Sequence, residues 1–423
     1  MKLEEWTKVK INQFGEIITG STPDTKNIGY WGGNIPFVSP ADFRFSVFVK
    51  KTERTLTEQG VRQSRLIPEA SILVTCIGSI GGIAIASCNC VTNQQINSVV
   101  CNDNIDDLFA YFLIQNNLFK LKELAGITTL PIINKTVFGN IELLCPTSIK
   151  EQEKIAEVLS TIDRAIEQTE AIIAKQQRIK TGLMQDLLTK GIDEDGNVRS
   201  EDTHEFKDSL LGQIPVEWEV NPLYKLANHV IDCPHTTPNF LEGGVLTART
   251  FNISDGVFDF GSASFVSESE YVERISRLEP QYGDIIFTRE APVGEAFVIP
   301  KGMKICLGQR TMLIRCDEAF LNPNYLLESL YSEDMRIRFD RMVGGTTNPH
   351  LNVADVRELL VKQPKTKEQI RITNVLAEIR SSLSATQDQR SKLQLTKTGL
   401  MQDLLTGKVR VTELLKDAAA ASP

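Results

Sequence analysis

The feature that most constrains this chain is a nine-residue segment, TGLMQDLLT, that occurs at 181–189 and again, unchanged, at 398–406. Aligning the chain with itself at a shift of 217 residues extends the match without a gap, from 150–189 onto 367–406. Twenty of these forty positions are identical, which chance does not produce, so the chain contains a duplication. Two copies of one segment predict two copies of one structural unit.

Both copies are predicted to be long helices, because their apolar residues recur at alternating steps of four and three. This 3.5-residue period is typical of a coiled-coil seam, in which polar residues lower stability but can fix the register. Polar residues interrupt both copies at matching places, Thr169 with Thr386 and Lys180 with Lys397. These shared features favour two helices packed on each other; the alternative is two amphipathic helices packed on separate domain cores. The apolar seam residues are Ile155, Leu159, Ile162, Ile166, Ile173, Leu183 and Leu187, then Ile372, Leu376, Ile379, Leu383, Leu393, Leu400 and Leu404.

Sequence identity is highest at the helix ends, where a seam requires only Leu183 and Leu187. The residues between them are repeated unchanged, although the middles of the helices have diverged. Identical outward faces at two places predict that two copies of one partner dock in the same way; the alternative is a recent duplication. The predicted partner-docking residues are Met184, Gln185, Asp186, Met401, Gln402 and Asp403.

The globular parts of the chain repeat more faintly. The frame G-x-T-T-x-P-x-x-N occurs at 126–134 and 344–352, and each copy precedes a predicted short helix and strand. Upstream, 66–86 and 278–299 both indicate a strand, a glycine-containing turn and a second strand. Domains that share a frame but differ in the segments between its elements can bind two different ligands with one fold.

The predicted organisation is therefore domain, helix, linker, domain, helix, with an α/β mixed (α+β) fold class. The linker is acidic, polar and contains glycine, as a surface connection should. The predicted boundaries are 1–149 for the first domain, 150–189 for its helix, 190–213 for the linker, 214–366 for the second domain, 367–406 for the second helix and 407–423 for the C-terminal tail.

Composition excludes several classes of protein. The chain is 41% hydrophobic and 24% charged, as in ordinary globular proteins. No apolar run reaches the ~18 residues of a membrane span, and no secretion signal is evident at the N-terminus. The eight cysteines are scattered without a disulfide framework, which fits a cytoplasmic location. Because the net charge is −8, contact with DNA would need local clusters of charge or partners that neutralise phosphates.

The sequence offers no convincing methyltransferase or ATPase motif. NPNY at 322–325 resembles the Asn-Pro-Pro-aromatic motif of amino-methyltransferases, but Asn324 stands where that motif has proline. Pro323 is better explained as the first turn of a helix. The chain lacks a G-x-x-x-x-G-K-[ST] phosphate loop, so we do not expect ATP-driven translocation by this chain.

Two weaker patterns suggest a nuclease or a metal site. PDTK at 23–26 lacks the second acidic residue that a nuclease site needs and has no copy in the other half. His229, Cys233 and His235 could bind zinc, but no fourth ligand is evident. We therefore predict no catalytic residues and no metal site, and a duplicated chain without catalytic motifs is typical of a binding module.

Polar loops and basic helices supply the candidate DNA-binding residues. Asn and Gln can pair with adenine, Arg and Lys with guanine, and basic side chains can also hold phosphates. For any single residue the alternative is an ordinary solvated charge. The candidates are Arg44, Lys50, Lys51, Arg54, Lys120, Lys122, Thr128, Thr129, Asn134 and Lys135 in the first domain, and Arg249, Arg289, Arg310, Arg336, Arg338, Arg341, Thr346, Thr347, Asn348, His350 and Asn352 in the second.

Taken together, the two KEQ…TGLMQDLLT helices, the segment FKDSLLGQIPVEWEV at 206–220 and the paired G-x-T-T-x-P-x-x-N loops resemble the specificity subunit of a Type I restriction–modification enzyme. The resemblance covers essentially the whole chain. It implies two target recognition domains with pseudo-twofold symmetry, each reading one half of a bipartite, asymmetric site in double-stranded DNA. It also implies that the two long helices form an antiparallel coiled coil that separates these domains as a spacer.

The resemblance further implies that this chain has no active site of its own. Two methylase subunits and two restriction subunits are the expected partners, and no membrane is involved. S-adenosylmethionine, ATP and Mg²⁺ are expected on those partners and not on this chain. The alternatives are a DNA methyltransferase that acts alone and a coiled-coil scaffold that does not bind DNA.

Overall fold

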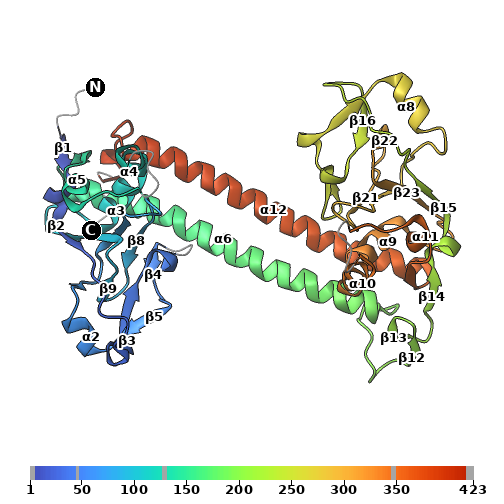
Figure 1. Ribbon diagram of the computed structural model, residues 1–423, viewed down its shortest axis with the longest axis horizontal. Helices are drawn as coiled ribbons and strands as arrows, with labels where there is room; N and C mark the ends of the chain where they lie inside the picture. The colour runs from blue at the N-terminus through green and yellow to red at the C-terminus, as the bar shows by residue number, and fades with distance from the viewer. Residues whose placement is uncertain (1–4, 44–46, 126–130, 344–348, 416–423) are drawn as a thin grey trace. The chain divides into compact units, whose positions relative to one another are not determined.

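The computed structural model describes residues 5–43, 47–125, 131–343 and 349–415. The chain divides into two compact units: unit 1 comprises Met1–Ile172 and Thr386–Pro423, and unit 2 comprises Ile173–Ala385. Each unit contains a mixed α/β lobe and about half of each long helix, α6 (Ile149–Thr189) and α12 (Thr366–Leu404), as Figure 1 shows. The predicted fold class and both long helices are confirmed.

The lobe of unit 1 is built around a five-stranded sheet in the order β2-β10-β7-β8-β4 and a four-stranded sheet in the order β5-β3-β9-β6. The central strand β7 reads ILVT and is buried along its whole length, which explains why it lacks polar alternation. A further strand pair joins β1 to β11. The strands are β1 (Trp6–Lys10), β2 (Gly15–Thr19), β3 (Trp31–Val38), β4 (Phe48–Val49), β5 (Arg54–Leu56), β6 (Leu66–Ile67), β7 (Ile72–Thr75), β8 (Ile83–Ala86), β9 (Cys90–Thr92), β10 (Ile96–Cys101) and β11 (Glu142–Pro146).

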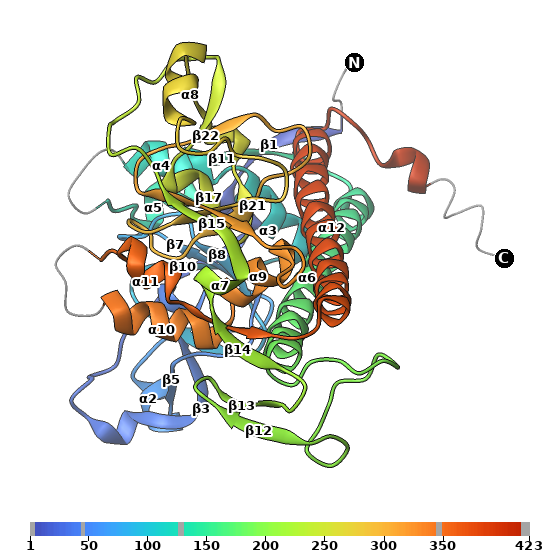
Figure 2. The same cartoon turned by 90° about the vertical axis from the view of Figure 1, so that its right-hand side faces the viewer.

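The lobe of unit 2 repeats this architecture, with sheets in the orders β15-β23-β20-β21 and β19-β16-β22 and a strand pair β14-β24. In both lobes the second sheet contains one parallel pair, β3 with β9 and β16 with β22. Figure 2 shows α8 (Glu268–Arg274) beside β22. The strands are β14 (Glu219–Pro222), β15 (Ala227–Asp232), β16 (Val245–Ala248), β17 (Ile253–Ser254), β18 (Val257–Phe258), β19 (Ser264–Val266), β20 (Ile285–Thr288), β21 (Ala296–Val298), β22 (Ile305–Leu307), β23 (Thr311–Cys316) and β24 (Leu360–Gln363).

The short helices of the two lobes also correspond in order. The polar side chain of Asp106 caps α3, and that of Asn322 caps α9. Pro323 lies in the first turn of α9, as the sequence predicts. The helices of unit 1 are α1 (Ile11–Phe14), α2 (Glu58–Arg62), α3 (Asp107–Asn116), α4 (Leu118–Ala125) and α5 (Lys135–Gly139). Those of unit 2 are α7 (Leu223–Leu226), α8, α9 (Pro323–Leu330), α10 (Glu333–Val343) and α11 (Val353–Arg357).

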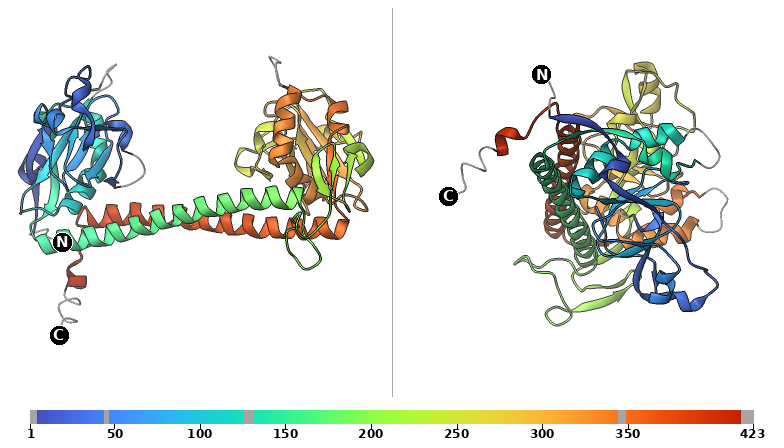
Figure 3. Two further views of the ribbon diagram at one scale, coloured as in Figure 1. Left: turned by 90° about the horizontal axis from the view of Figure 1, so that it is seen from below. Right: turned by 90° about the vertical axis from the view of Figure 1, so that its left-hand side faces the viewer.

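The two long helices pack against each other in antiparallel orientation within unit 1 (Figure 3). Leu404 belongs to the same core cluster as Ile155 and Leu159. Further along, Lys397 Nζ lies 2.7 Å from Asp163 Oδ1. Because the residue numbers fall on α12 as they rise on α6, the helices run in opposite directions.

The same arrangement recurs within unit 2. There Leu187 belongs to the same core cluster as Ile372 and Leu376, and Gln176 Nε2 donates a hydrogen bond to Ser382 Oγ at 2.9 Å. The helix ends are thus part of the lobe cores as well as of the seam. Both sequence interpretations of the helices therefore hold, since the helices pack on each other and also on the lobes.

The glutamate of each KEQ motif is buried and paired with an arginine that follows the other long helix. In unit 2, both oxygens of Glu368 accept from Arg199, and the carboxylate also accepts from the indole of Trp218 at 3.2 Å. In unit 1, Arg410 donates to both oxygens of Glu151 at 2.6 and 2.8 Å. These bonds raise the pKa of Arg410. Both arginines belong to a G-x-V-R segment, so each helix start is held by the residues beyond the opposite helix end.

The glutamine of each KEQ motif ties the same helix start to a lobe helix. Gln152 accepts from the backbone N–H of Asp106 at 2.9 Å, and Gln369 accepts from that of Asn322 at 2.7 Å. The two donors, Asp106 and Asn322, are the N-cap residues of α3 and α9. The repeated Glu-Gln part of the KEQ motif is therefore explained by contacts inside each unit.

The linker contains more structure than its composition predicts. Its last part forms a hairpin of β12 (Phe206–Ser209) and β13 (Gly212–Pro215), because Leu210 and Leu211 lie in a tight turn that Gly212, at φ +82°, completes.

All eight cysteines are free thiols, and burial raises the pKa of Cys76 to about 11. Among the described residues, no helix is long and apolar enough to cross a membrane.

We predict that Glu368→Ala lowers the free energy of unfolding of unit 2 by about 3–5 kcal/mol, because it leaves the buried guanidinium of Arg199 unpaired. Urea unfolding followed by the fluorescence of Trp218 measures this change. The control is Glu378→Ala, an exposed position on the same helix, where a change within about 0.5 kcal/mol is expected. Equal losses in the two variants would contradict the proposed importance of the buried pair.

Candidate nucleic-acid interface

Matching hairpins, β7–β8 and β20–β21, carry the predicted glycine-containing turns. In each, a buried threonine holds the turn: Thr75 Oγ1 donates to Ser79 O at 2.5 Å and accepts from Gly82 N at 2.7 Å. Thr288 Oγ1 likewise donates to Pro292 O at 2.7 Å and accepts from Glu295 N at 2.9 Å. These bonds fix the backbone of each turn from its buried side. The side chains that the turn exposes to solvent can therefore differ between the two lobes.

The end of each G-x-T-T-x-P-x-x-N segment lies against this turn. Isolated backbone bridges join Ile77 to Ile132 in unit 1 and Glu290 to His350 in unit 2. The bridged residues are apolar in unit 1 and polar or charged in unit 2. One backbone frame thus presents two chemically different surfaces.

A second repeated feature, which we call the Thr–Gln pair, lies on the loops that enter the main sheet. Thr22 Oγ1 donates to Gln94 Oε1 at 2.6 Å in unit 1, and Gln309 Nε2 donates to Thr237 Oγ1 at 2.7 Å in unit 2. Each threonine precedes a proline, and each pair spans 72 residues of sequence. The sequence prediction missed these four residues, although the Thr-Pro dipeptides and the equal spacing were available as a signal.

An arginine stacked on an aromatic ring lies near each Thr–Gln pair. The guanidinium carbon of Arg54 is 3.5 Å from the ring centre of Trp31. That of Arg249 is 4.3 Å from the ring centres of both Phe240 and Phe251. Among the described residues, no ion pair is found for either arginine.

Several of the other predicted cations bind partners inside their own lobe. Arg289 Nε lies 3.2 Å from Asp232 Oδ1, and Arg336 pairs with Glu295 at 3.0 Å. Arg338 donates to Leu360 O at 3.0 Å, and burial lowers its pKa. These contacts give the three arginines a structural role, and their DNA contacts remain predictions.

The two asparagines of the repeated frame lie at helix starts. Asn134 accepts from Val137 N at 2.9 Å and caps α5, while Asn352 is the N-cap residue of α11. Each asparagine thereby ends its repeated loop and begins a helix. His350, two residues before the second cap, is exposed.

The remaining predicted cations are mostly at the surface. Lys50 lies 3.7 Å from Glu167, Lys120 donates to Glu142 O at 3.3 Å, and Arg310 lies 3.2 Å from Glu290. The side chains of Lys51, Lys135 and Arg341 are exposed, and Lys122 lies beside Gly81. Six predicted residues lie outside the described part of the chain: Arg44, Thr128, Thr129, Thr346, Thr347 and Asn348.

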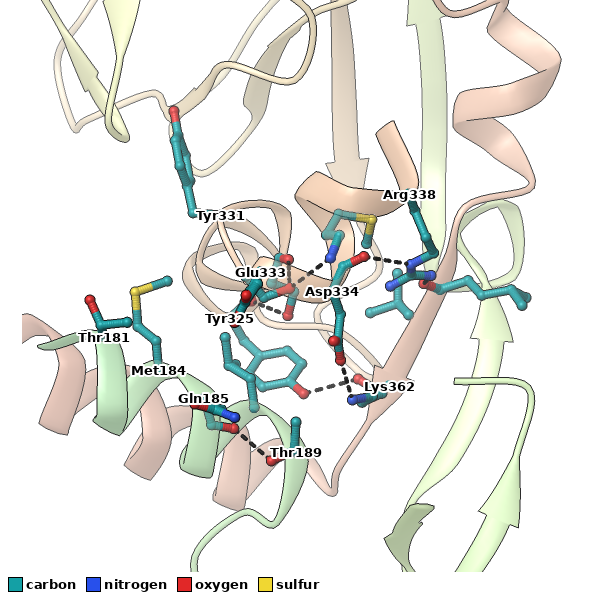
Figure 4. A pocket seen from close by; sticks show the side chains of 16 residues that line it. Thr181, Met184, Gln185, Thr189, Tyr325, Tyr331, Glu333, Asp334, Arg338 and Lys362 are labelled. Carbon is teal, nitrogen blue, oxygen red and sulfur yellow. Dashed lines mark hydrogen bonds and ion pairs between the residues drawn. The ribbon is translucent and has the colours of Figure 1, made fainter. Parts of the chain in front are cut away.

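The predicted partner-docking residues lie where the long helices meet the lobes. In unit 2, Met184 and Gln185 line a cavity of about 370 Å³ whose far wall includes Asp334 and Lys362 (Figure 4). Within that wall, Lys362 Nζ forms an ion pair with Asp334 Oδ2 at 3.0 Å. In unit 1, Met401 packs partly against the lobe core.

The other docking candidates are closer to solvent. Gln185 and Gln402 are exposed. Asp186 pairs with Lys190 at 2.9 Å, and Asp403 pairs with Lys408 at 3.0 Å. Each aspartate is therefore a half-exposed ion-paired carboxylate at the end of a long helix.

The residues considered for a zinc site have other surroundings. Burial raises the pKa of the Cys233 thiol, and His235 Nε2 lies 3.3 Å from Asp232 Oδ2. Within the described ranges, no group of three or more His, Cys, Asp or Glu side chains is placed to hold a metal ion.

A family model described as the Type I restriction modification DNA specificity domain matches residues 3–176 and 243–395 of this chain. The MjaIX specificity subunit of Methanocaldococcus jannaschii, a Type I restriction enzyme subunit, is 26% identical over 97% of this chain and 95% of the relative. The HindI specificity subunit of Haemophilus influenzae is 33% identical over 38% of this chain and 37% of the relative.

Two solved structures share the fold. The S subunit of a Type I restriction–modification system from M. genitalium has a TM-score of 0.61 at 17% identity and covers 96% of this chain and 98% of its own. A chain from a study of assembly and conformational transition in the type I R-M system has a TM-score of 0.56 at 15% identity, covering 95% and 98%.

Proposed function

This chain belongs to the family of Type I restriction–modification DNA specificity proteins, and we propose that it reads a bipartite, asymmetric target in double-stranded DNA, one half-site with each lobe. It is a specificity subunit of such a system. In this proposal the long helices set the number of base pairs between the half-sites. Two methylase subunits and two restriction subunits are the proposed partners.

The observation that carries the proposal is the contrast between scaffold and loops in the two lobes. The order β2-β10-β7-β8 matches β15-β23-β20-β21, and β5-β3-β9 matches β19-β16-β22, with one further edge strand on each of these sheets in unit 1. The helix order and the threonine bonds that hold the turns are also shared. The residues that join loop and turn differ, with half-buried Ile77 and exposed Ile132 in one lobe and half-buried Glu290 and exposed His350 in the other. Equal frames with unequal surfaces are what two readers of different sequences require.

Catalysis is assigned to the partner subunits in this proposal. The sequence lacks a phosphate loop and a complete amino-methyltransferase motif, and the relatives are named as specificity subunits. S-adenosylmethionine, ATP and Mg²⁺ would therefore be bound by the methylase and restriction subunits. Those subunits would also offset the net charge of −8, which opposes DNA binding by this chain alone.

The docking surfaces proposed for the methylase subunits are the two TGLMQDLLT helix ends. Their Leu187 and Leu404 are buried in lobe cores, which explains the repeat of the leucines. Internal packing leaves Gln185 and Gln402 exposed and the two aspartates half-exposed, so it does not explain why these residues recur unchanged. A common partner at both places would explain them.

Exchanging residues 214–366 for the corresponding segment of another specificity subunit should change only one half of the methylated motif. The sheets of the second lobe and one of its core clusters lie within this segment, and its other core cluster is completed by residues of the repeated helices, which another specificity subunit of the same architecture would meet in the same way. The measurement is a map of methylated bases in cells that express this chain with its methylase. A change in both half-sites would contradict the proposal, and unchanged methylation without this chain would favour a methylase that needs no such subunit.

Deleting one heptad from each long helix, residues 169–175 and 384–390, should shorten the spacer by about three base pairs and leave the half-sites unchanged. Seven helical residues span about 10.5 Å, and base pairs are stacked about 3.4 Å apart. These heptads lie between the contacts Asp163–Lys397 and Gln176–Ser382, so the seam continues on either side. The methylation map again provides the measurement, and altered half-site bases would contradict the spacer role.

Charge reversal at both helix ends, Asp186→Lys with Asp403→Lys, should abolish co-purification of the methylase with this chain. Each carboxylate already pairs with one lysine and is half-exposed, so reversal places two like charges on the proposed docking surface. The control is Asp388→Lys, an exposed position in the middle of α12. Methylase retained by the double variant, with this chain still folded, would rule out docking at these ends.

A further inference from the structure

Several arginines beside the loops of the two lobes bind carboxylates or backbone carbonyls, but in the part of the chain that the structure describes no such bond is found for the guanidinium of Arg54 or Arg249. In unit 1, Arg54 lines a cavity of about 250 Å³ together with Thr22, Asn93 and Gln94. Its guanidinium lies over the ring of Trp31, whose indole N–H donates to Asp24 O at 3.2 Å. Trp31 is thus fixed to the loop that carries the Thr–Gln pair, and it holds Arg54 beside that pair.

In unit 2, Arg249 is held beside the Thr–Gln pair by different residues. Its guanidinium lies against Phe240, which follows Thr237 by three residues, and against Phe251. Its only hydrogen bond from the guanidinium among the described residues goes to Ser264 Oγ at 3.3 Å. The neighbouring strand brings Gln309 close, because Gly308 N donates to Ala248 O at 2.8 Å.

The two arginines occupy different positions in one shared frame. The bond from Asn93 N to Val38 O at 3.0 Å is the unit 1 counterpart of the bond from Gly308 N to Ala248 O. Arg249 therefore corresponds to Ser39, the residue after β3. Arg54 instead belongs to β5, which pairs with β3 in the sheet. The Thr–Gln pair is common to both lobes, whereas the arginine beside it is placed differently in each.

We propose that each lobe reads a guanine of its half-site through this stacked arginine, Arg54 in unit 1 and Arg249 in unit 2, with the Thr–Gln pair marking the place where the DNA lies. This inference rests on the proposed function. Arginine can donate two parallel hydrogen bonds to O6 and N7 of guanine in the major groove. Stacking keeps the guanidinium extended before DNA binds, so less conformational freedom is lost on binding.

The neighbouring carboxylates leave the guanidinium of Arg54 available. The oxygens of Asp42 accept from Ser39 N at 2.8 Å, Ser39 Oγ at 2.7 Å and Glu53 N at 2.9 Å, so they already have donors. Glu53 is exposed and adjoins Arg54 in the same cavity. A carboxylate of this kind can accept from N4 of cytosine, the partner of guanine in a base pair.

The test uses the full-length chain in complex with its methylase, carrying Arg54→Ala or Arg249→Ala. We expect Arg54→Ala to make one guanine position in one half-site of the methylated motif degenerate, and Arg249→Ala to do so in the other half-site. Binding is then measured on duplexes in which that guanine is replaced by 7-deazaguanine, which lacks N7. The wild-type complex should bind the substituted duplex about 10-fold or more weakly, whereas the matching alanine variant should bind both duplexes equally.

Arg62→Ala in unit 1 and Lys301→Ala in unit 2 are the controls, since both positions are exposed and lie outside the cavity. Neither control should alter the motif. An unchanged motif in both alanine variants, or equal weakening on every sequence, would overturn the guanine assignment while the proposed function stands. A wild-type complex without any preferred sequence would overturn the proposed function and this inference with it.

Discussion

The buried carboxylate of each KEQ motif is the interaction on which the rest of the structure depends. Glu151 and Glu368 lie at the starts of the two long helices, where an unpaired charge would be costly. Each glutamate pairs with the arginine of a G-x-V-R segment that follows the end of the opposite helix. Glu368 also accepts a hydrogen bond from the indole of Trp218. The adjacent glutamines then attach the helix starts to α3 and α9. Lobe and helices within a unit are therefore fixed to each other by one short motif.

Bonds inside each lobe also allow its exposed loops to diverge without loss of the fold. The turns of the main hairpins are held from inside by Thr75 and Thr288, whose bonds go to backbone atoms. Backbone bonds of this kind do not depend on which side chains the turn presents to solvent. Unit 1 can consequently present isoleucines where unit 2 presents Glu290 and His350. A scaffold with this property would suit the proposed reading of two different half-sites.

Sequence periodicity predicted the helices to within a residue or two, because a heptad pattern depends only on local spacing. The glycine-turn pattern predicted the strand-turn-strand segments, and the apolar segments after each repeated loop predicted a short helix. The partners of the candidate DNA-binding cations were harder to predict. Arg289 and Arg336 read as surface cations, but each pairs with a carboxylate of its own lobe. Whether a charged side chain is available or already paired depends on residues distant in sequence, and composition carries no such information.

The sequence by itself determined that the chain is a duplication with two long helices and two lobes of one architecture, because repeats and apolar periods are properties of order along the chain. Only the tertiary structure decided which polar residues meet. Thr22 reaches Gln94 and Thr237 reaches Gln309 across 72 residues, and Glu368 reaches Arg199 across 169. Side-chain hydrogen bonds act over about 3 Å in space whatever the separation in sequence, so they become visible only when the strands and helices have packed.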